Sequence, residues 1–432
     1  MKLTAWGRYP QIESEAAAFE TRSQVSRLLK LPESTIPYGM GRSYGDSALN
    51  PRVIMTRRYD KFLSFDPETG ILHVECGVTL AEIIDSLLPR GWFLSVTPGT
   101  RYITVGGAIA SDVHGKNHHQ AGCFSQYVHH LELMLPDGDV RQCSRSENAE
   151  LFRATCGGMG LTGLILTATI QLRQVRSGFI RETVMRCRTL EEVCHGFDAH
   201  GEVSYSVAWI DCLASGGSIG RSVLMLGEHS DSGKLTPEPR TPIPMPINLP
   251  GFCLNRYSVD VFNRLYYRSS PPFAEGQRIP LETFFYPLDR ISNWNRMYGR
   301  GGFTQYQLVL PKAASASGLR EILRRIATAG LGSFLGVLKL FGPENDNLLS
   351  FPMEGYTMAL DFKIEPRLFP FLDELDRIVL DHGGRLYLSK DVRMGREMFI
   401  RGYPRWKAFD SLRITYGLKT RLRSLQSDRL GL

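Results

Sequence analysis

A glycine cluster over residues 156–163, CGGMGLTG, constrains the fold of this 432-residue chain more than any other segment. It contains a formal GxGxxG pattern, which opens a helix in a doubly wound α/β fold. The residues that follow here, LILTATIQLRQV, are β-branched and alternate in polarity, so they predict a strand. A helix is predicted before the cluster instead, beginning near Glu147 or Asn148. This order of elements excludes a dinucleotide-binding βαβ unit at this point.

Another glycine loop lies near the N-terminus, over Gly39–Asp46. Successive backbone amides in such a loop form a concave nest for a pyrophosphate, and Arg42 and Ser43 add hydrogen-bond donors. Tyr44 stands where a dinucleotide fingerprint has its third glycine, and no clear helix follows. Ahead of the loop, residues 16–31 predict a helix. We interpret the loop as a phosphate cradle of a different architecture.

The segment Pro98–Gly122, PGTRYITVGGAIASDVHGKNHHQAG, joins a Gly-Gly turn to a basic loop rich in histidine. The Gly-Gly turn lets the backbone approach a ligand closely, although an ordinary strand-to-helix turn is the alternative. His114 and His118 are four apart, but Gly115 and Asn117 are poor helix residues and no cysteine pair completes a zinc set. We therefore predict no metal site, and we interpret the segment as a cofactor loop that meets a reaction centre.

The composition is that of a globular protein, with 43% hydrophobic and 22% charged residues, and the length predicts two domains or one large domain with an insertion. The net charge of +7 includes no basic block typical of a nucleic-acid arm. Eight scattered cysteines indicate reduced thiols and a cytoplasmic location. No signal peptide or membrane span is predicted, so any membrane association would be peripheral. Arginine and lysine gather near the C-terminus, where a solvated helix face or a contact with anionic lipid would explain them.

Beyond residue 175 the character of the sequence changes, with strand-like alternation over residues 176–226 around a helical LEEVCHGFDAH. From Phe303 on, the pattern is strand, helix, strand, strand, helix, strand. Strands are predicted over FTQYQLVLP, FLGVLKLFG, YTMALDFKI and RLYLSKDVR, and helices over SASGLREILRRIATAG and FPFLDELDRIVLDHGG. This order fits an antiparallel sheet backed by helices, which would bind the substrate. Residues 228–250 and 268–283 are predicted to be mobile loops.

Two lysines stand in apolar, strand-like surroundings. Lys339 lies within FLGVLKLFG, and Lys390 ends RLYLSKDVR. Desolvation there would lower the pKa of a lysine and suit it to proton transfer or to binding an anionic substrate. The alternative is a surface lysine at a strand end.

Four blocks together resemble the FAD-dependent oxidases of the vanillyl-alcohol-oxidase fold, with its PCMH-type FAD-binding domain. These blocks are GMGRSYGDSALN, PGTRYITVGGAIASDVHGKNHH, LFRATCGGMGLTGLILTATI and GGRLYLSKDVRM. They are most similar to the branch that oxidises decaprenylphosphoryl ribose, and HGKNHH is the most specific piece. The resemblance runs over nearly the whole chain. It implies an α+β fold with an FAD-binding domain over 1–175, an antiparallel-sheet substrate domain over 176–385, and a C-terminal segment, 386–432, that returns to the FAD domain.

The resemblance also implies which residues hold FAD. They are Pro37, Gly39, Gly41, Arg42, Ser43, Tyr44, Gly45, Asp46, Ser47, Gly99, Thr104, Val105, Gly106, Gly107, Ser111, His114, Ile165 and Tyr387. Members of the family often carry a histidine in the first glycine loop that bonds covalently to the flavin. Arg42 stands there in this chain, so we expect FAD to be bound non-covalently.

The implied reaction is oxidation of the 2-hydroxyl of a polyprenylphosphoryl ribofuranose to the 2-keto sugar. It is the first half of an epimerisation to the arabinose donor for cell-envelope polysaccharide. A separate NADH-dependent short-chain reductase would complete it. The residues expected to take part in catalysis are Lys390, Tyr387 and His114. Those expected to contact the substrate are Lys116, Gln307, Lys339, Thr357, Ala359 and Lys390.

Two positions depart from the pattern of the mycobacterial members, which carry asparagine at the position of Thr357 and cysteine at that of Ala359. Activity is still expected, since that thiol is not needed for hydride transfer, but the sugar preference could change. Two other functions stay open. One is a sugar-lactone or alditol oxidase of the same flavin fold. The other is a non-catalytic subunit that binds flavin or prenyl phosphate.

Overall fold

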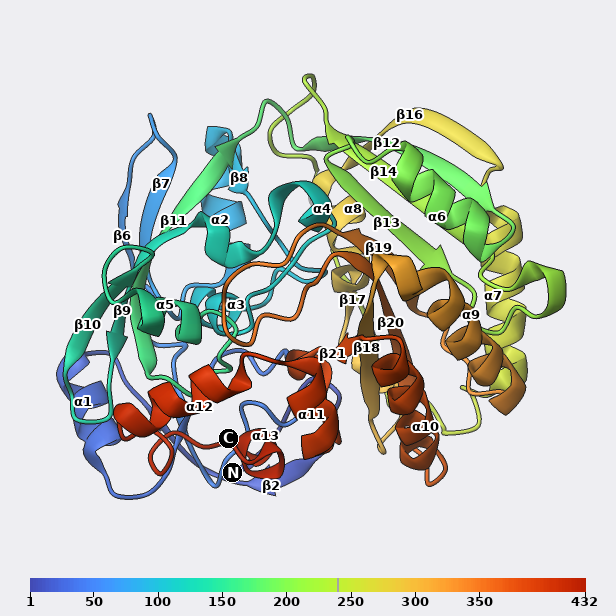
Figure 1. Cartoon of the computed structure of the whole chain (residues 1–432). Helices are drawn as coiled ribbons and strands as arrows, with labels where there is room; N and C mark the ends of the chain where they lie inside the picture. The colour runs from blue at the N-terminus through green and yellow to red at the C-terminus, as the bar shows by residue number, and fades with distance from the viewer. Residues whose placement is uncertain (239–240) are drawn as a thin grey trace.

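The fold is α+β and is built on two large antiparallel sheets (Figure 1). In the computed structural model, residues 1–238 and 241–432 are described. The first sheet has the order β10-β9-β11-β7-β6, and β8 pairs with the far end of β11. Its strands are β6 (Phe62–Phe65), β7 (Ile71–Glu75), β8 (Trp92–Leu94), β9 (Val128–Met134), β10 (Val140–Ser144) and β11 (Leu164–Gln174). The strand predicted after the second glycine cluster is confirmed as β11.

Short N-terminal strands lie beside the first sheet. β3 (Glu15–Ala18) and β4 (Ile36–Tyr38) both pair in parallel with β5 (Arg52–Met55), and β1 (Lys2–Thr4) pairs with β2 (Gln11–Glu13). The helix predicted over 16–31 is therefore wrong in its first part, because pairing with β5 takes residues 15–18 into a strand. Helix α1 (Arg22–Lys30) begins at Thr21, whose side chain and that of Gln24 form a capping box.

Four helices connect these strands. They are α2 (Leu80–Leu87), α3 (Val105–Ala110), α4 (His118–Ala121) and α5 (Ala149–Thr155). The helix predicted before the second glycine cluster is α5, and Asn148 is its N-cap residue in the left-handed conformation. The turn from α5 into β11 needs its glycines, since Gly157 and Gly160 have φ of +86° and +78°.

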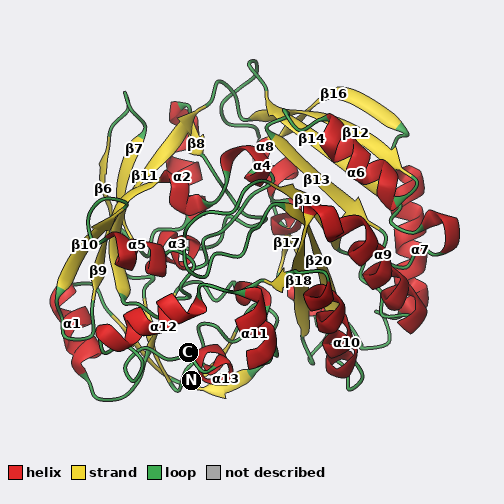
Figure 2. Ribbon diagram, viewed as in Figure 1, coloured by secondary structure: helices red, strands yellow, loops and turns green. Residues whose placement is uncertain are grey.

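The second sheet has eight strands in the order β16-β12-β14-β13-β19-β20-β18-β21, all antiparallel. Its strands are β12 (Phe179–Cys187), β13 (Tyr205–Ile210), β14 (Ser222–His229), β16 (Phe273–Pro280), β18 (Phe303–Pro311), β19 (Gly336–Phe341), β20 (Gly355–Lys363) and β21 (Arg385–Leu386). Helices α6 (Leu190–Ala199), α9 (Lys312–Ala329) and α10 (Leu368–Asp381) pack on one face (Figure 2). The prediction of an antiparallel sheet backed by helices is confirmed.

The segment predicted as a loop over 268–283 is ordered secondary structure. It holds the end of α7 (Arg256–Ser269), the edge strand β16 and the start of α8 (Leu281–Phe285). The prediction failed because β16 is exposed and polar, so its pairing with β12 leaves no alternating pattern in the sequence. In the other predicted loop, 228–250, the short strand β15 (Ile243–Pro244) pairs with β17 (Ile291–Ser292), and residues 239–240 lie outside the described part of the chain.

The C-terminal segment crosses back to the first half of the chain. RLYLSKDVR was predicted as a strand, but only Arg385–Leu386 pair with β18, and a 3-10 turn follows over Leu388–Lys390. Lys390 is the last residue of this turn. Helices α11 (Arg396–Gly402), α12 (Trp406–Thr415) and α13 (Leu425–Leu430) complete the segment. The buried Arg413 in α12 donates to the carbonyl oxygen of Leu161, at 3.1 Å.

Candidate active site

A cavity of about 820 Å³ is lined by residues from both halves of the chain and from the C-terminal segment. It brings together most of the residues expected from the sequence. Four of the expected residues do not line it: Gly45, Asp46, Val105 and Thr357. Val105, the first residue of α3, is buried in the hydrophobic core. Thr357 is buried behind the cavity lining, where its hydroxyl donates to the carbonyl oxygen of Leu308 at 2.8 Å.

The glycine positions on this cavity serve two purposes, because some allow close packing of the protein and Gly99 leaves open room for a ligand. A Cβ at Gly39 would lie 2.7 Å from Oγ1 of Thr104. At Gly99 a Cβ would meet nothing within 4 Å, because that position faces the open cavity. Gly41 has φ of +59°, which favours glycine in the first loop. These features fit a cofactor that passes close to the backbone.

Helix α3 sits at the floor of the cavity. Thr104 caps it, with its hydroxyl oxygen accepting from the backbone N–H of Gly107 at 3.1 Å. The N–H of Gly106 donates to the carbonyl oxygen of Cys76 at 2.9 Å, and a Cβ at Gly106 would press on Cys76. The Gly-Gly pair therefore also serves as a tight helix start, as the alternative interpretation held.

His114 is enclosed by aromatic rings and carries a free donor. Its ring centroid lies 4.7 Å from that of Phe341 and 5.2 Å from that of Tyr387. Nε2 of Gln307 lies 3.1 Å from Nε2 of His114, so the histidine nitrogen accepts and the neutral ring carries its proton on Nδ1. That Nδ1 is buried and has no partner among the described residues. Burial, reinforced by the charge of Lys339, holds the pKa of His114 well below its usual value.

Three lysines converge on the cavity. Nζ of Lys390 lies 3.8 Å from the ring centroid of Tyr44, and Nζ of Lys116 donates to the carbonyl oxygen of Phe284. Burial lowers the pKa of Lys390 to about 7, with Asp361 opposing the shift, and it lowers that of Lys116 to about 7. The pKa of Lys339 falls to about 8 for the same reason. These amines can exchange a proton near neutral pH or bind an anionic group.

Asp361 is a residue behind the cavity lining that sequence reasoning missed. It is buried and accepts a hydrogen bond from Nε2 of Gln305 at 2.6 Å, and burial raises its pKa to about 7. Its charge acts on Lys390. The sequence could have indicated Asp361, because side chains two residues apart lie on the same face of a strand. Asp361 therefore shares a face of β20 with the expected residues Thr357 and Ala359.

The hydroxyl of Tyr387 is already engaged. It donates to the carbonyl oxygen of Ser111, the C-cap of α3, at 2.8 Å. Burial raises the pKa of this phenol. The geometry therefore favours Lys390 over Tyr387 as a proton acceptor, with Tyr387 tying the C-terminal segment to α3.

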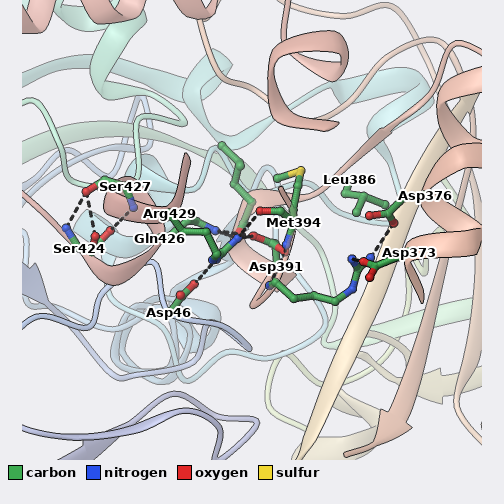
Figure 3. A network of polar contacts seen from close by, with 12 residues as sticks. Asp46, Asp373, Asp376, Leu386, Asp391, Met394, Ser424, Gln426, Ser427 and Arg429 are labelled. Atoms are coloured by element: carbon green, nitrogen blue, oxygen red, sulfur yellow. Dashed lines mark hydrogen bonds and ion pairs between the residues drawn. The ribbon is translucent and has the colours of Figure 1, made fainter. Parts of the chain in front are cut away.

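A network of charged side chains holds the turn that carries Lys390 (Figure 3). Arg429 in α13 donates to Asp46 at 2.6 Å and to Asp391 at 2.9 Å. Asp391 follows Lys390 directly, and the backbone N–H of Tyr44 donates to the carbonyl oxygen of Ser389 at 2.9 Å. Asp46 therefore holds the first glycine loop against the lysine turn instead of facing the cavity.

The other histidines of HGKNHH have structural contacts. Nδ1 of His118 accepts from the backbone N–H of Gly342 at 3.2 Å, and Nε2 of His119 lies 2.8 Å from the carbonyl oxygen of Val203. Across residues 1–238 and 241–432 no group of three or more His, Cys, Asp or Glu side chains is placed to hold a metal ion.

Comparison with known proteins defines the class. Residues 16–144 match the model of a family described as FAD binding domain. Together with the cavity that these residues line, the match defines a FAD-dependent oxidoreductase with a PCMH-type fold. The chain is 36% identical to decaprenylphosphoryl-β-D-ribose oxidase of Mycolicibacterium smegmatis, over 94% of this chain and 92% of that protein. The chain therefore belongs to the same family of FAD-dependent oxidases.

More distant similarities cover less of the chain. An uncharacterised protein of Streptomyces coelicolor is 32% identical over 82% of this chain and all of its own length. L-gulonolactone oxidase of Bos taurus is 30% identical over 46% of this chain and 46% of its own length.

Proposed function

We propose that this protein oxidises the 2-hydroxyl of a polyprenylphosphoryl ribofuranose to the 2-keto sugar. The observation that carries the proposal is the convergence of Lys116, Lys339 and Lys390 on one cavity that Gly99 and His114 also line. Such a set can bind a sugar phosphate and accept a proton in the same place. Similarity to decaprenylphosphoryl-β-D-ribose oxidase over nearly the full length supports this substrate class.

Lys390 acts as the base in this proposal. Bound FAD supplies the acceptor for the hydride that leaves the carbon bearing the 2-hydroxyl. The neutral amine of Lys390 takes the hydroxyl proton as that C–H bond breaks, so the carbon gains its double bond to oxygen. A pKa of about 7 keeps much of this amine neutral near neutral pH.

The neighbouring side chains position the sugar. Lys116 and Lys339 hold the phosphate and ring hydroxyls, and Gln307 keeps the ring of His114 in one orientation. Nε2 of Gln307 also donates to the hydroxyl of Thr357 at 3.3 Å, so Thr357 acts on specificity through Gln307. Ala359 lines the wall and contacts the substrate directly.

The first glycine loop and α3 hold FAD non-covalently. The guanidinium of Arg42 lies 3.9 Å from a ring centroid of Trp6, where it can pair with the pyrophosphate. The unpartnered Nδ1 of His114 is a donor available to a bound ligand. The proposal takes residues 1–175 as the FAD-binding domain, 176–385 as the substrate domain, and 386–432 as the segment that closes the site.

The ketone would leave for a separate NADH-dependent short-chain reductase, which would form the arabinose sugar. We place the protein in the cytoplasm, with peripheral contact at the inner membrane where its lipid-linked substrate resides. Among the described residues no helix is long and apolar enough to span a bilayer.

The experiment is incubation of the purified protein with a short-chain prenylphosphoryl ribose and an electron acceptor, followed by mass spectrometry and NMR of the sugar. The proposal expects the 2-keto sugar and no arabinose until a reductase and NADH are added. Arabinose formed by this protein alone would contradict the division of labour. Flavin without any sugar oxidation would favour a non-catalytic binding subunit.

A further inference from the structure

Apolar side chains gather on one exposed region of the substrate half. Of the fifteen large hydrophobic side chains exposed in the described part of the chain, eight lie between residues 243 and 273. Helix α7 is at the centre of this region, near the right edge of the view in Figure 1, and the six-stranded sheet lies at the left. Exposed apolar clusters of this kind mark interaction surfaces.

The outward face of α7 is an apolar stripe. Tyr257, Val261 and Leu265 are four residues apart, and they are 80%, 56% and 63% exposed. The orientation of the helix is fixed from the other side, where Val259 is buried and Nδ2 of Asn263 donates to Asp211 at 2.8 Å. A surface helix ordinarily turns polar residues outward, so the stripe needs a partner.

The inward face of α7 covers an apolar branch of the active-site cavity. Phe262 and Tyr266 line that cavity, together with Val184 and Val223 of the sheet. The ring centroid of Tyr266 lies 4.6 Å from that of Trp209 on β13. One helix therefore separates the apolar end of the cavity from an apolar patch on the surface.

The charges on α7 are mostly positive. The helix carries Arg256, Arg264 and Arg268 against the acidic Asp260, which pairs with Arg264 at 2.9 Å. Arg256 and Arg268 are exposed and form no ion pair with the described residues. An apolar stripe beside unpaired arginines matches a surface of hydrocarbon and anionic phosphate.

We propose that α7 docks on an anionic lipid surface. Tyr257, Val261 and Leu265 enter the boundary between headgroups and acyl chains, and Arg256 and Arg268 contact lipid phosphates. The apolar branch beneath α7 then opens toward the layer in which a prenyl chain is dissolved. This last step rests on the proposed function, whereas docking itself does not.

The test is co-sedimentation of the FAD-loaded protein with phosphatidylglycerol–phosphatidylcholine vesicles, without substrate. The variant Tyr257→Ser/Val261→Ser/Leu265→Ser is compared with Phe62→Ser/Leu63→Ser, a control pair that is 40% and 44% exposed on β6. We expect the control to bind like the wild type and the α7 variant to bind at least about tenfold more weakly. Arg256→Gln/Arg268→Gln should weaken binding to the anionic vesicles and leave binding to pure phosphatidylcholine unchanged.

Equal vesicle binding by the wild type and the α7 variant would overturn the proposal. So would an α7 variant that alters only the oligomeric state in light scattering, since the stripe would then be a protein interface. Retained flavin absorbance and circular dichroism show that the variant is folded. Vesicle binding without oxidation of prenylphosphoryl ribose would refute the proposed substrate and leave the docking intact.

Discussion

Lys390 is the residue on which the proposed reaction depends most, because it is buried at the cavity and Asp361 acts on its charge. We predict that Lys390→Met lowers kcat about a hundredfold or more, since the proposed reaction assigns the uptake of the hydroxyl proton to Lys390. The flavin content should stay unchanged if, as proposed, Lys390 acts on the sugar hydroxyl and does not hold the cofactor. Steady-state kinetics and the visible spectrum measure both, with the exposed Lys407→Met as the matched control. Full activity in Lys390→Met would refute its role as a base.

The pH dependence of kcat tests the environment of the same lysine. The amine must be neutral to act as a base, so kcat should rise with pH through about 7, the pKa to which burial lowers Lys390. Asp361 opposes that shift, Lys339 reinforces it, and the rings of Tyr44 and His114 lie nearby. Asp361→Asn should therefore move the acidic limb to lower pH. If the acidic limb of the kcat profile moves to higher pH in Asp361→Asn, Asp361 does not raise the pKa of Lys390.

Gly99 offers a test of the cofactor site that is independent of turnover. A Cβ there meets no protein atom within 4 Å, so Gly99→Val should leave the fold intact and reduce the FAD retained after purification. Gly217→Val, at a surface position equally free of neighbours, is the control and should keep its FAD. The flavin absorbance per mole of protein measures the FAD content of each variant, and thermal unfolding shows whether each variant is folded. Equal FAD content would place the cofactor elsewhere.

At the scale of elements, α13 acts as a clamp through Arg429. Removing this arginine leaves Asp46 and Asp391 buried and unpaired, which costs about 3 kcal/mol of stability. The matched control is Arg423→Ala, whose pair with Asp428 is exposed and contributes less than about 1 kcal/mol. Urea unfolding of Arg429→Ala and Arg423→Ala should show this difference. Equal midpoints would show that the network does not hold the lysine turn.

Elements with a strong local pattern could be predicted from the sequence. FTQYQLVLP forms β18 over the predicted residues, and the helix before Gly330 ends there in the left-handed conformation. Elements decided by tertiary pairing could not. Residues 15–18 are helix-forming by propensity but pair with β5, and the polar β16 is a strand only because β12 lies beside it.

The site residues also divide into those that a local sequence pattern indicates and those that only tertiary contacts define. The glycine loops, the Lys390 segment and HGKNHH stand out in the sequence, and most of the residues expected from them line the cavity. The apolar lining from the substrate half, such as Val184, Trp209 and Phe262, was not expected. The role of Asp46 was not expected either, because its partner Arg429 lies 383 residues away. Nor was that of Tyr387, whose hydroxyl contacts Ser111 across the cavity wall.

At the scale of the whole molecule, the chain forms one site from three distant stretches. The first half supplies the glycine loops and His114, the eight-stranded sheet supplies Gln307 and Lys339, and the C-terminal segment supplies Lys390. Full-length similarity to decaprenylphosphoryl-β-D-ribose oxidase, against similarity to L-gulonolactone oxidase over less than half of the chain, agrees with a site that needs all three stretches.

We propose above that this site oxidises a prenylphosphoryl ribose. The most direct measurement is anaerobic stopped-flow absorbance of the flavin, with a short-chain prenylphosphoryl ribose in one experiment and a free aldonolactone in the other. The proposed function predicts bleaching of the flavin by the prenylphosphoryl ribose, at a rate that Lys390→Met abolishes, and none by the lactone. Bleaching by the lactone alone would contradict it and identify a lactone oxidase.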